Sequence, residues 1–357
     1  MTEVVDQLSS QEPLHGCLQE LHDASVLLDM QGFQWRPSWV ELRDGKRPPE
    51  GGARDPGEWP HGWQYWASST LDSRFRKLSM LAGQSAARQA HLRSHSGHNS
   101  GCALSHAPTT PEFTIQPHLF QVLLRERLRL PLFLTESTCS GCHEPLDPLG
   151  HHRAACSHSG RIQRRATPIE RVIARICREA GARVKFNALL RDMNVRVASS
   201  DARRIEVLAQ DLPCFGGSQL AVDVTLRSPL TRSGEAQPGA AEEDGAILLQ
   251  ARVDKENKYP ELLNGRCRLV VVALETGGRW SNEAVDFSWQ LAQAKAREVP
   301  SFMTHQMALV WERRWTRMLS TVCAVSFAGS LVEPSCADVT TERDMPSLSE
   351  ALTHDPR

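Results

Sequence analysis

At 357 residues the chain is long enough for two or three domains with separate cores, and its formal net charge of −1 gives no overall sign of a nucleic-acid partner. No apolar run approaches the length of a membrane span, and most of the ten cysteines are scattered rather than arranged as a disulfide framework. These features argue against an integral membrane protein and a disulfide-rich secreted domain, and they favour a soluble intracellular protein.

Residues 1–62 show little periodic patterning, and the stretch at 45–62 is rich in glycine, proline and charge. Such a composition predicts a linker or a disordered segment. The short apolar pieces ahead of it indicate a fold whose other half is missing, so the chain begins like the cut edge of a longer protein. Helical patterning then covers 63–93 and 115–130, which predicts a helical region over 63–135.

A metal-ligand pattern follows in the segment CSGCHEPLDPLGHHRAAC. Cys139 and Cys142 have the spacing at which two thiolates grip one ion from a tight turn, and three residues separate His152 from Cys156. Together they predict a tetrahedral Cys3His zinc site. His151 competes with His152 for the fourth position, and a chance cluster around the CxxC is the alternative. Four protein ligands leave no open position, so we expect a structural or nucleic-acid-positioning site rather than a catalytic one.

The following part of the chain predicts an α/β core. Its expected elements are a helix at 168–181, strands at 184–190, 204–209 and 220–226, a helix at 247–263 and a strand at 268–276. This α-β-β-β-α-β order resembles the core of restriction-endonuclease-like nucleases. Two further helices are expected at 282–297 and 301–331. We therefore predict a zinc knuckle at 136–160, a nuclease-like domain at 161–331 and a disordered tail at 332–357.

Two strands of this core each carry one acid among aliphatic residues, Glu206 in RIEVLA and Asp223 in LAVDVTL. A carboxylate in such a run is unfavourable unless it is paired or holds a cation, so both are candidate Mg²⁺ or Mn²⁺ ligands. The alternative is an acid at a strand edge that faces solvent. A nuclease of this kind usually has a lysine two residues after the second acid, where this chain has Thr225. We expect Lys255 or Lys258 of the following helix to supply that charge; ordinary exposed lysines are the alternative.

Further polar residues accompany these acids. Tyr259 is expected to hydrogen-bond a phosphate oxygen, and Glu275, near the end of the last strand, is either a third metal ligand or a surface residue. Between Arg161 and Arg204 there are 12 Lys plus Arg against 4 Asp plus Glu, a local excess of 8. Such an excess predicts either a track for a phosphate backbone or a solvated helix face.

The order of these motifs resembles the carboxy-terminal region of site-specific LINE-type, non-LTR retrotransposon polyproteins, over residues 63–331. In that family a CCHC knuckle precedes a restriction-like endonuclease with R-P-D, (D/E)-V and K-x-x-K-Y motifs. The positions that match are Cys139, Cys142, His152 and Cys156 in the knuckle, and Glu206, Asp223, Lys255, Lys258 and Tyr259 in the nuclease. The resemblance implies a metal-dependent nuclease that acts on DNA, with element RNA as a further partner, in the nucleus.

Two features depart from that family. Ile205-Glu206 replaces the Pro-Asp pair, and no YxDD-type polymerase motif occurs, so the chain is not a reverse transcriptase. We expect a retrotransposon-derived, Mg²⁺-dependent DNA endonuclease that nicks target DNA. A catalytically inactive nucleic-acid-binding remnant of the same element is the alternative. A third interpretation is a protein-interaction scaffold in which zinc only stabilises the fold.

Overall fold

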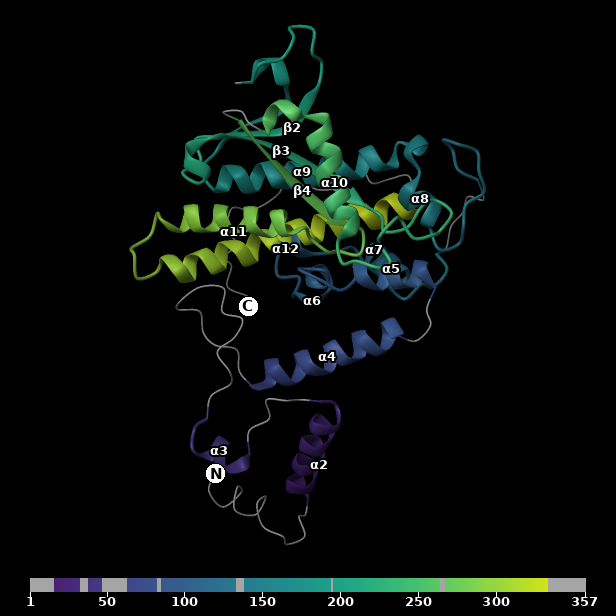
Figure 1. The fold of residues 1–357 in the computed structure, drawn as a ribbon, viewed down its shortest axis with the longest axis vertical. Helices are drawn as coiled ribbons and strands as arrows, with labels where there is room; N and C mark the ends of the chain where they lie inside the picture. The colour runs from purple at the N-terminus through teal and green to yellow at the C-terminus, as the bar shows by residue number, and fades with distance from the viewer. Residues whose placement is uncertain are drawn as a thin grey trace. The chain divides into compact units, whose positions relative to one another are not determined.

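The computed structural model describes residues 16–32, 38–46, 63–81, 85–132, 138–193, 195–263 and 267–332 (Figure 1). The chain divides into two compact units between Gln84 and Ser85. The first unit holds the helices α2 (Cys17–Met30), α3 (Trp39–Arg43) and α4 (Trp63–Leu81). In this unit the Arg74 guanidinium of α4 donates to the Met30 carbonyl of α2 at 2.5 Å.

Two boundaries differ from the sequence-based expectation. The prediction that residues 1–62 lack regular structure is wrong for α2 and α3, because the Leu-rich sequence of α2, free of glycine and proline, favours a helix even without a strong apolar stripe. The predicted helical region at 63–135 is shared between the two units, with α4 in the first and the later helices in the second. The described residues end at Val332, so the predicted tail lies outside them.

The second unit is built on a four-stranded mixed sheet, so the predicted α/β class is confirmed. Its strands are β1 (Arg183–Leu189), β2 (Arg204–Gln210), β3 (Gln219–Arg227) and β4 (Cys267–Glu275), in the order β1-β2-β3-β4. The first three strands pair antiparallel, and β4 pairs parallel to β3. A parallel pair needs a crossover, which α10 (Ala246–Lys258) supplies. The predicted order of helix, three strands, helix and strand is therefore present.

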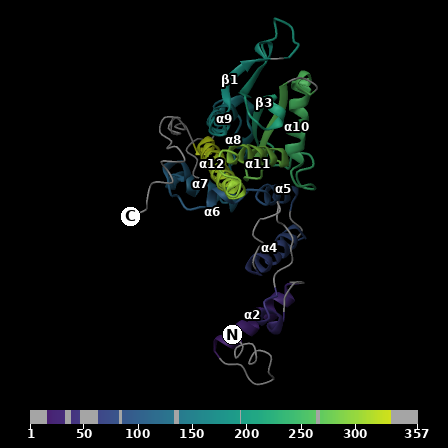
Figure 2. The same cartoon turned by 90° about the vertical axis from the view of Figure 1, so that its left-hand side faces the viewer.

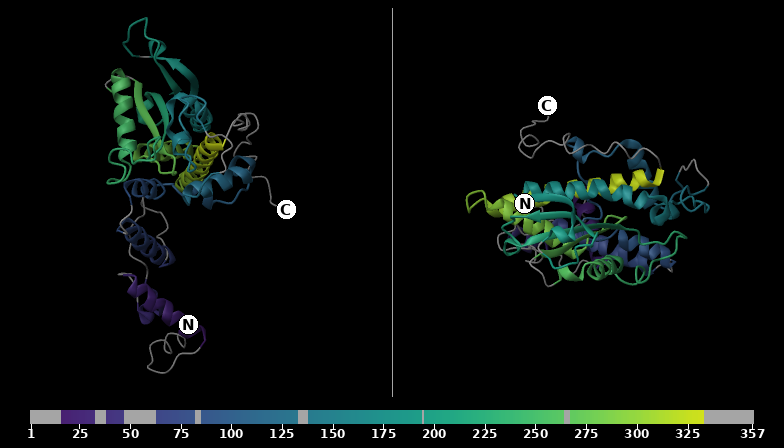
Figure 3. Two further views of the ribbon diagram at one scale, coloured as in Figure 1. Left: turned by 90° about the vertical axis from the view of Figure 1, so that its right-hand side faces the viewer. Right: turned by 90° about the horizontal axis from the view of Figure 1, so that it is seen from above.

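Helices cover both faces of this sheet. The helices α9 (Arg161–Glu179), α11 (Asn282–Ala296) and α12 (Thr304–Val332) pack on one face, and α10 packs on the other. Successive side chains of a strand alternate, so Val222 and Val224 of β3 enter the first core and Ala221 enters the second. Figure 2 shows α9 and α10 on opposite sides of the strands, and Figure 3 shows α12, in yellow, on the α9 side.

Helix α9 begins at Arg161 and not, as predicted, at Pro168. Tertiary hydrogen bonds stabilise the turns before the proline: Arg161 donates to the Ser330 carbonyl at 3.2 Å, and Arg165 donates to the Leu226 carbonyl at 3.0 Å. Pro168 itself removes only one backbone hydrogen bond of the helix. The basic stretch is therefore partly internal. Its arginines that are exposed along α9 are Arg164, Arg171 and Arg178.

Shorter helices surround the end of this layer. They are α5 (Ala86–Ser94), α6 (Cys102–Ser105), α7 (Pro117–Arg127) and α8 (His151–Ala155), with a 3-10 turn at Pro111–Phe113. The turn after β4 is bonded to α5, since the Gly277 amide donates to the Ser94 hydroxyl at 3.1 Å. Among the helices that the structure describes, none has the length and apolar character needed to span a bilayer.

A buried ion-pair network joins the 3-10 turn to two long helices. The carboxylate of Glu112 has no solvent exposure and accepts from Arg175 of α9 at 3.2 Å and from Arg314 of α12. Glu179 extends the network by accepting from the indole nitrogen of Trp315 at 2.7 Å. Because the charges are paired inside the protein, removing one of them leaves its partners buried without compensation.

We expect the substitution Glu112→Gln to lower the free energy of unfolding by about 3–5 kcal/mol, because two buried arginines lose their shared carboxylate. Urea denaturation monitored by tryptophan fluorescence measures this change. Glu298→Gln is the control, since that carboxylate pairs at the surface and should change stability by less than about 1 kcal/mol. Equal effects of the two substitutions would contradict the prediction.

Candidate functional site

The two candidate acids lie where the ladder between β2 and β3 ends. The register of this antiparallel pair closes at Val207↔Val222, and Glu206 and Asp223 are the next residue on each strand. Beyond this point the strands no longer exchange backbone hydrogen bonds. The Val224 amide instead donates to Oε2 of Glu206 at 2.5 Å. The end of the ladder thus brings both carboxylates to one place and holds the first of them by a backbone donor.

Asp223 is fully buried and is paired with a lysine of the crossover helix. Its neighbours Val222 and Val224 point into the α9 core, so the Asp223 side chain faces α10. There the ammonium of Lys255 forms an ion pair with Oδ1 of Asp223. Within the described residues, neither carboxylate oxygen accepts a well-formed hydrogen bond. A buried carboxylate in this condition has free lone pairs for a further cation.

Glu206 belongs to a cluster of three carboxylates. Burial raises the pKa of Glu206 to about 8; the negative charges of Asp223 and Glu170 add to the rise, while the Val224 amide and Lys255 oppose it. The pKa of Glu170 is also raised, by burial and then by the charge of Asp223. The three acids therefore repel one another in a partly desolvated place. A bound divalent cation would relieve that repulsion.

The sequence-based reasoning missed Glu170, although a signal was present. Glu170 lies three residues before Ile173 and seven before Cys177, on the apolar stripe of an amphipathic helix. An acid on such a stripe is directed toward the interior and not toward water. Helix α9 contributes that acid from one side of the sheet and α10 contributes Lys255 from the other side, and both groups lie close enough to Asp223 to interact with its charge.

The three residues of the K-x-x-K-Y motif, Lys255, Lys258 and Tyr259, have different environments in the structure. Lys255 reaches Asp223, whereas Lys258 is exposed and its Nζ lies 4.8 Å from the centroid of the Tyr259 ring. Tyr259 is fully buried, and its hydroxyl donates to the Arg204 carbonyl at 2.7 Å. That hydrogen is therefore not available to a phosphate in this arrangement. Burial, with the nearby charge of Asp223, raises the pKa of Tyr259 and keeps the phenol neutral.

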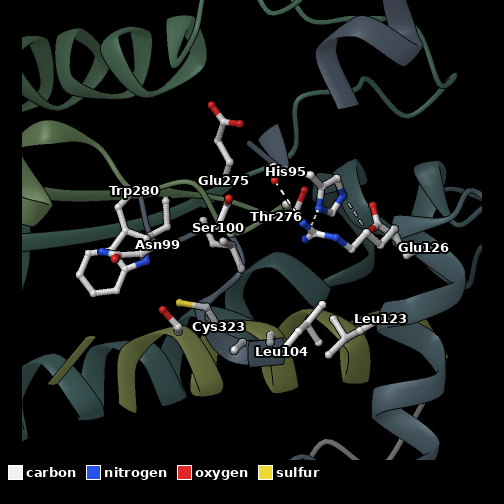
Figure 4. Close-up of a pocket in the computed structure, with 18 residues that line it drawn as sticks. His95, Asn99, Ser100, Leu104, Leu123, Glu126, Glu275, Thr276, Trp280 and Cys323 are labelled. Atoms are coloured by element: carbon white, nitrogen blue, oxygen red, sulfur yellow. Dashed lines mark hydrogen bonds and ion pairs between the residues drawn. The ribbon is translucent and has the colours of Figure 1, made fainter. Parts of the chain in front are cut away.

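Glu275 is not brought into this cluster. It pairs in register with Arg227, four residues along β3 from Asp223, which corresponds to about 13 Å of strand. Burial raises the pKa of Glu275 to about 7, although the Ser94 hydroxyl and the charge of Arg279 oppose the rise. Figure 4 shows Glu275 beside a separate cavity of about 40 Å³.

The cysteine–histidine segment forms a second site with metal-ligand geometry. The four ligand atoms of Cys139, Cys142, His152 and Cys156 all lie within 4.8 Å of one another. The sulfur of Cys156 is 3.8 Å from each of the other two sulfurs. Tetrahedral coordination with zinc–sulfur bonds near 2.3 Å places thiolates about 3.8 Å apart. The cluster can therefore hold a zinc-like ion, with the His152 nitrogen, 3.1 Å from the Cys142 sulfur, moving outward by about 0.5 Å.

The acidity of Cys139 suits a metal ligand. Burial by itself raises the pKa of this thiol, but hydrogen bonds from the Cys142 and Gly141 amides and the neighbouring His152 outweigh burial and lower the pKa to about 6. A thiolate is the form that binds metal, and it is present here near neutral pH. His151 is not a ligand of this set: it lines a different cavity, and the expected competition with His152 is decided by the direction of the two side chains.

The fold fixes the two halves of the cluster by different means. A hairpin closed by the bridge Thr138↔Pro145 carries the first two cysteines, and the short helix α8 carries the histidine. The carboxylate of Asp147 accepts from the amides of His151 and His152 at 3.1 and 2.7 Å, which caps the first turn of α8. Gly150 precedes the helix with φ 81°, a conformation that favours glycine.

Comparisons with known proteins give no further identification. No model of a known protein family matches the sequence, and no curated protein matches it either.

Proposed function

We propose that the chain is a Mg²⁺-dependent endonuclease of the restriction-endonuclease-like type that nicks DNA. The observation that carries the proposal is the convergence of Glu170, Glu206 and Asp223 with Lys255 at the open end of the β2–β3 ladder. Phosphodiester hydrolysis requires carboxylates for the metal and a positive charge beside the scissile phosphate, and the cluster offers both. The element order α9, three strands, α10 and β4 supports the same proposal.

Each residue of the cluster has a separate part in this proposal. The carboxylates of Asp223 and Glu206 would hold Mg²⁺, with Glu170 beside them, because oxygen donors with unused lone pairs suit this ion. Bound magnesium supplies Lewis-acid polarisation of the phosphate and lowers the pKa of a coordinated water. Lys255 holds its ammonium next to Asp223, where it neutralises charge on a phosphate oxygen. Tyr259 fixes the end of α10 through its bond to β2.

The experiment that tests the proposal is nicking of supercoiled plasmid by the purified chain with Mg²⁺ or Mn²⁺, beside an EDTA control. Conversion to the open circle with metal and none with EDTA would support the nuclease. A plasmid that is shifted on a gel but never nicked would overturn it and favour the inactive nucleic-acid-binding remnant.

The exposed arginines of α9 extend the proposal to DNA binding. Arg164, Arg171 and Arg178 recur every seventh residue, so they form one solvent-facing row about 21 Å long. A row of this length can follow a phosphate backbone. We expect the triple substitution of these arginines by glutamine to weaken binding to DNA of any sequence. It should also reduce the slope of log affinity against log salt by about 1 for each phosphate that an arginine no longer neutralises.

Fluorescence anisotropy with a labelled duplex at several salt concentrations measures that slope. The matched control is Arg183→Gln together with Arg191→Gln, two exposed arginines away from the α9 row. A slope that is the same in the triple variant and in the wild type would remove the row from the binding surface.

The pH dependence of stability tests the state of Glu206. Its folded pKa is about 8 and its unfolded value is about 4.3, so its contribution to stability is present below about pH 4 and is lost as the pH rises through 8. Without metal, Glu206→Gln should therefore be more stable than the wild type at about pH 9, by about 1–3 kcal/mol, and this difference should shrink toward about pH 5. Saturating Mg²⁺ should reverse the order, because only the wild type binds the ion fully.

Urea unfolding in EDTA and in Mg²⁺ at several pH values measures both effects. If Glu206→Gln were less stable than the wild type at about pH 9 in EDTA, the raised pKa of Glu206 would be contradicted.

A further inference from the structure

A third group of side chains that can bind a metal lies apart from the two sites described above. His91 of α5, His95 at the C-cap of α5 and Glu126 of α7 converge: His91 Nε2 is 3.2 Å from Oε1 of Glu126, His95 Nε2 is 3.3 Å from Oε2, and the two Nε2 atoms are 3.1 Å apart. The His95 amide still donates to the His91 carbonyl at 3.1 Å, so the two side chains, four residues apart, lie on one face at the end of α5. The donor set is two imidazole nitrogens and one carboxylate.

The three distances join four atoms, because the two histidines contact different oxygens of the Glu126 carboxylate. An ion with bonds of about 2.1 Å to its ligands places neighbouring donor atoms about 3.0 Å apart at right angles and about 3.4 Å apart at the tetrahedral angle. The observed 3.1–3.3 Å lies between these limits. An ion that lies between the two imidazole nitrogens and the carboxylate can therefore contact all three groups with little side-chain movement.

The three side chains are mostly buried, and two small cavities adjoin them. His91 is 4% exposed, and the side chains of His95 and Glu126 are 10% and 14% exposed. His95 and Glu126 line the cavity of about 40 Å³ (Figure 4). A second cavity, of about 10 Å³, is lined by His91, Glu126 and His151. The larger cavity has room for water molecules and the smaller one for about one.

The hydrogen bonds from Arg127 identify the tautomer of the His95 imidazole. Its guanidinium donates to Nδ1 of His95 at 3.0 Å and to the His95 carbonyl at 3.2 Å. Since a guanidinium only donates, Nδ1 is the acceptor and the ring hydrogen lies on Nε2, directed at Glu126. A metal at Nε2 takes the place of that hydrogen and moves it to Nδ1. Arg127 therefore favours the metal-free form, and a hydrogen-bond acceptor in its place would favour the metal-bound form.

We propose that His91, His95 and Glu126 form a second transition-metal site, for a divalent ion such as Zn²⁺, with at least one coordination position open to the adjoining cavities. Imidazole donors select such ions over Mg²⁺ and Ca²⁺, so this site differs in its metal from the carboxylate cluster. Three protein ligands also distinguish it from the closed Cys3His set. The proposal is independent of nuclease activity.

Zinc content of the full chain, measured by atomic emission after dialysis against buffered Zn²⁺, tests the proposal. We expect about two equivalents in the wild type, one at each site, and about one in His91→Gln. His118→Gln, which changes an exposed histidine of α7, is the matched control and should keep both. One equivalent in the wild type, or no change in His91→Gln, would overturn the proposal and leave the triad as a hydrogen-bonded link between α5 and α7.

Two further measurements keep the test decisive if a variant folds poorly. Wild-type protein loaded with Co²⁺ should show thiolate charge-transfer bands from the Cys3His site and, separately, weak visible bands without them from the second site. Absence of the second signal would overturn the proposal. Arg127→Gln places a side-chain oxygen near Nδ1 of His95 and should tighten Zn²⁺ at the second site by about tenfold or more. Weaker or unchanged binding in that variant would contradict the assignment of His95 as a ligand.

Discussion

Replacing Asp223 with asparagine is expected to lower magnesium-dependent nicking by at least about 10³-fold, which corresponds to about 4 kcal/mol of transition-state stabilisation. Asp223 is the most buried acid of the cluster and the partner of Lys255, so its loss removes a metal ligand and also releases the lysine from its position. The amide keeps the size of the side chain, and the released Lys255, 14% exposed, can turn toward water, so the chain should remain folded. Plasmid nicking at saturating Mg²⁺ measures the activity, and circular dichroism checks the fold.

Asp254→Asn is the matched control for that experiment. Asp254 lies one residue before Lys255 on the same helix, but it is 41% exposed and pairs with Arg227 at the surface. Its substitution should leave nicking within about threefold of the wild type, because a surface ion pair contributes about 1 kcal/mol or less. Asp223→Asn with full activity would remove the carboxylate cluster as the catalytic centre.

Zinc at the Cys3His cluster is a proposal, and its removal is expected to cause the largest loss of stability in the chain. The cluster joins the hairpin at Thr138–Pro145 to α8, and α8 is attached to the rest of the unit by Arg153, which donates to the Leu331 carbonyl at 2.6 Å. Structural zinc contributes up to about 10–16 kcal/mol in small zinc domains, so we expect Cys139→Ser to lose several kcal/mol and about one equivalent of zinc.

Thermal unfolding and zinc analysis of the same samples measure these effects together. Cys102→Ser is the control, because that thiol lies outside the cluster and should retain both the stability and the metal. The Cys139→Ser substitution affects only the Cys3His site, whereas a chelator would also remove zinc from the histidine–glutamate site. A Cys139→Ser protein with unchanged zinc content would contradict a Cys3His site.

Most of the sheet that carries the candidate nuclease centre was predictable from local patterns. The strands containing Glu206 and Asp223 are short aliphatic runs between turn residues, so their identity and order follow from β propensity and spacing. The ligands of the knuckle follow from a spacing that a tight turn and one helical turn impose. By contrast, α9 begins before its proline because arginines bind carbonyls far along the chain, and no local pattern records such bonds.

Local patterns also could not decide between the two lysines or identify Glu170. Lys255 and Lys258 are both plausible from their positions, and only the packing of α10 on the sheet directs Lys255 to Asp223 and leaves Lys258 exposed. Glu170 is 36 residues from Glu206 in the chain, and their charges interact because α9 packs against β2 and β3.

Propensity, periodicity and donor chemistry are local properties, so the amino-acid sequence alone was enough to identify most strands and helices and the residues able to act as ligands. Which of those ligands meet followed from the packing of the second unit. That packing placed His152 rather than His151 at the thiolates, separated Glu275 from Asp223, and brought α5 to α7 so that His91 and His95 face Glu126. Burial, pKa shifts and coordination depend on distances through space, and those distances arise only when the whole unit is folded.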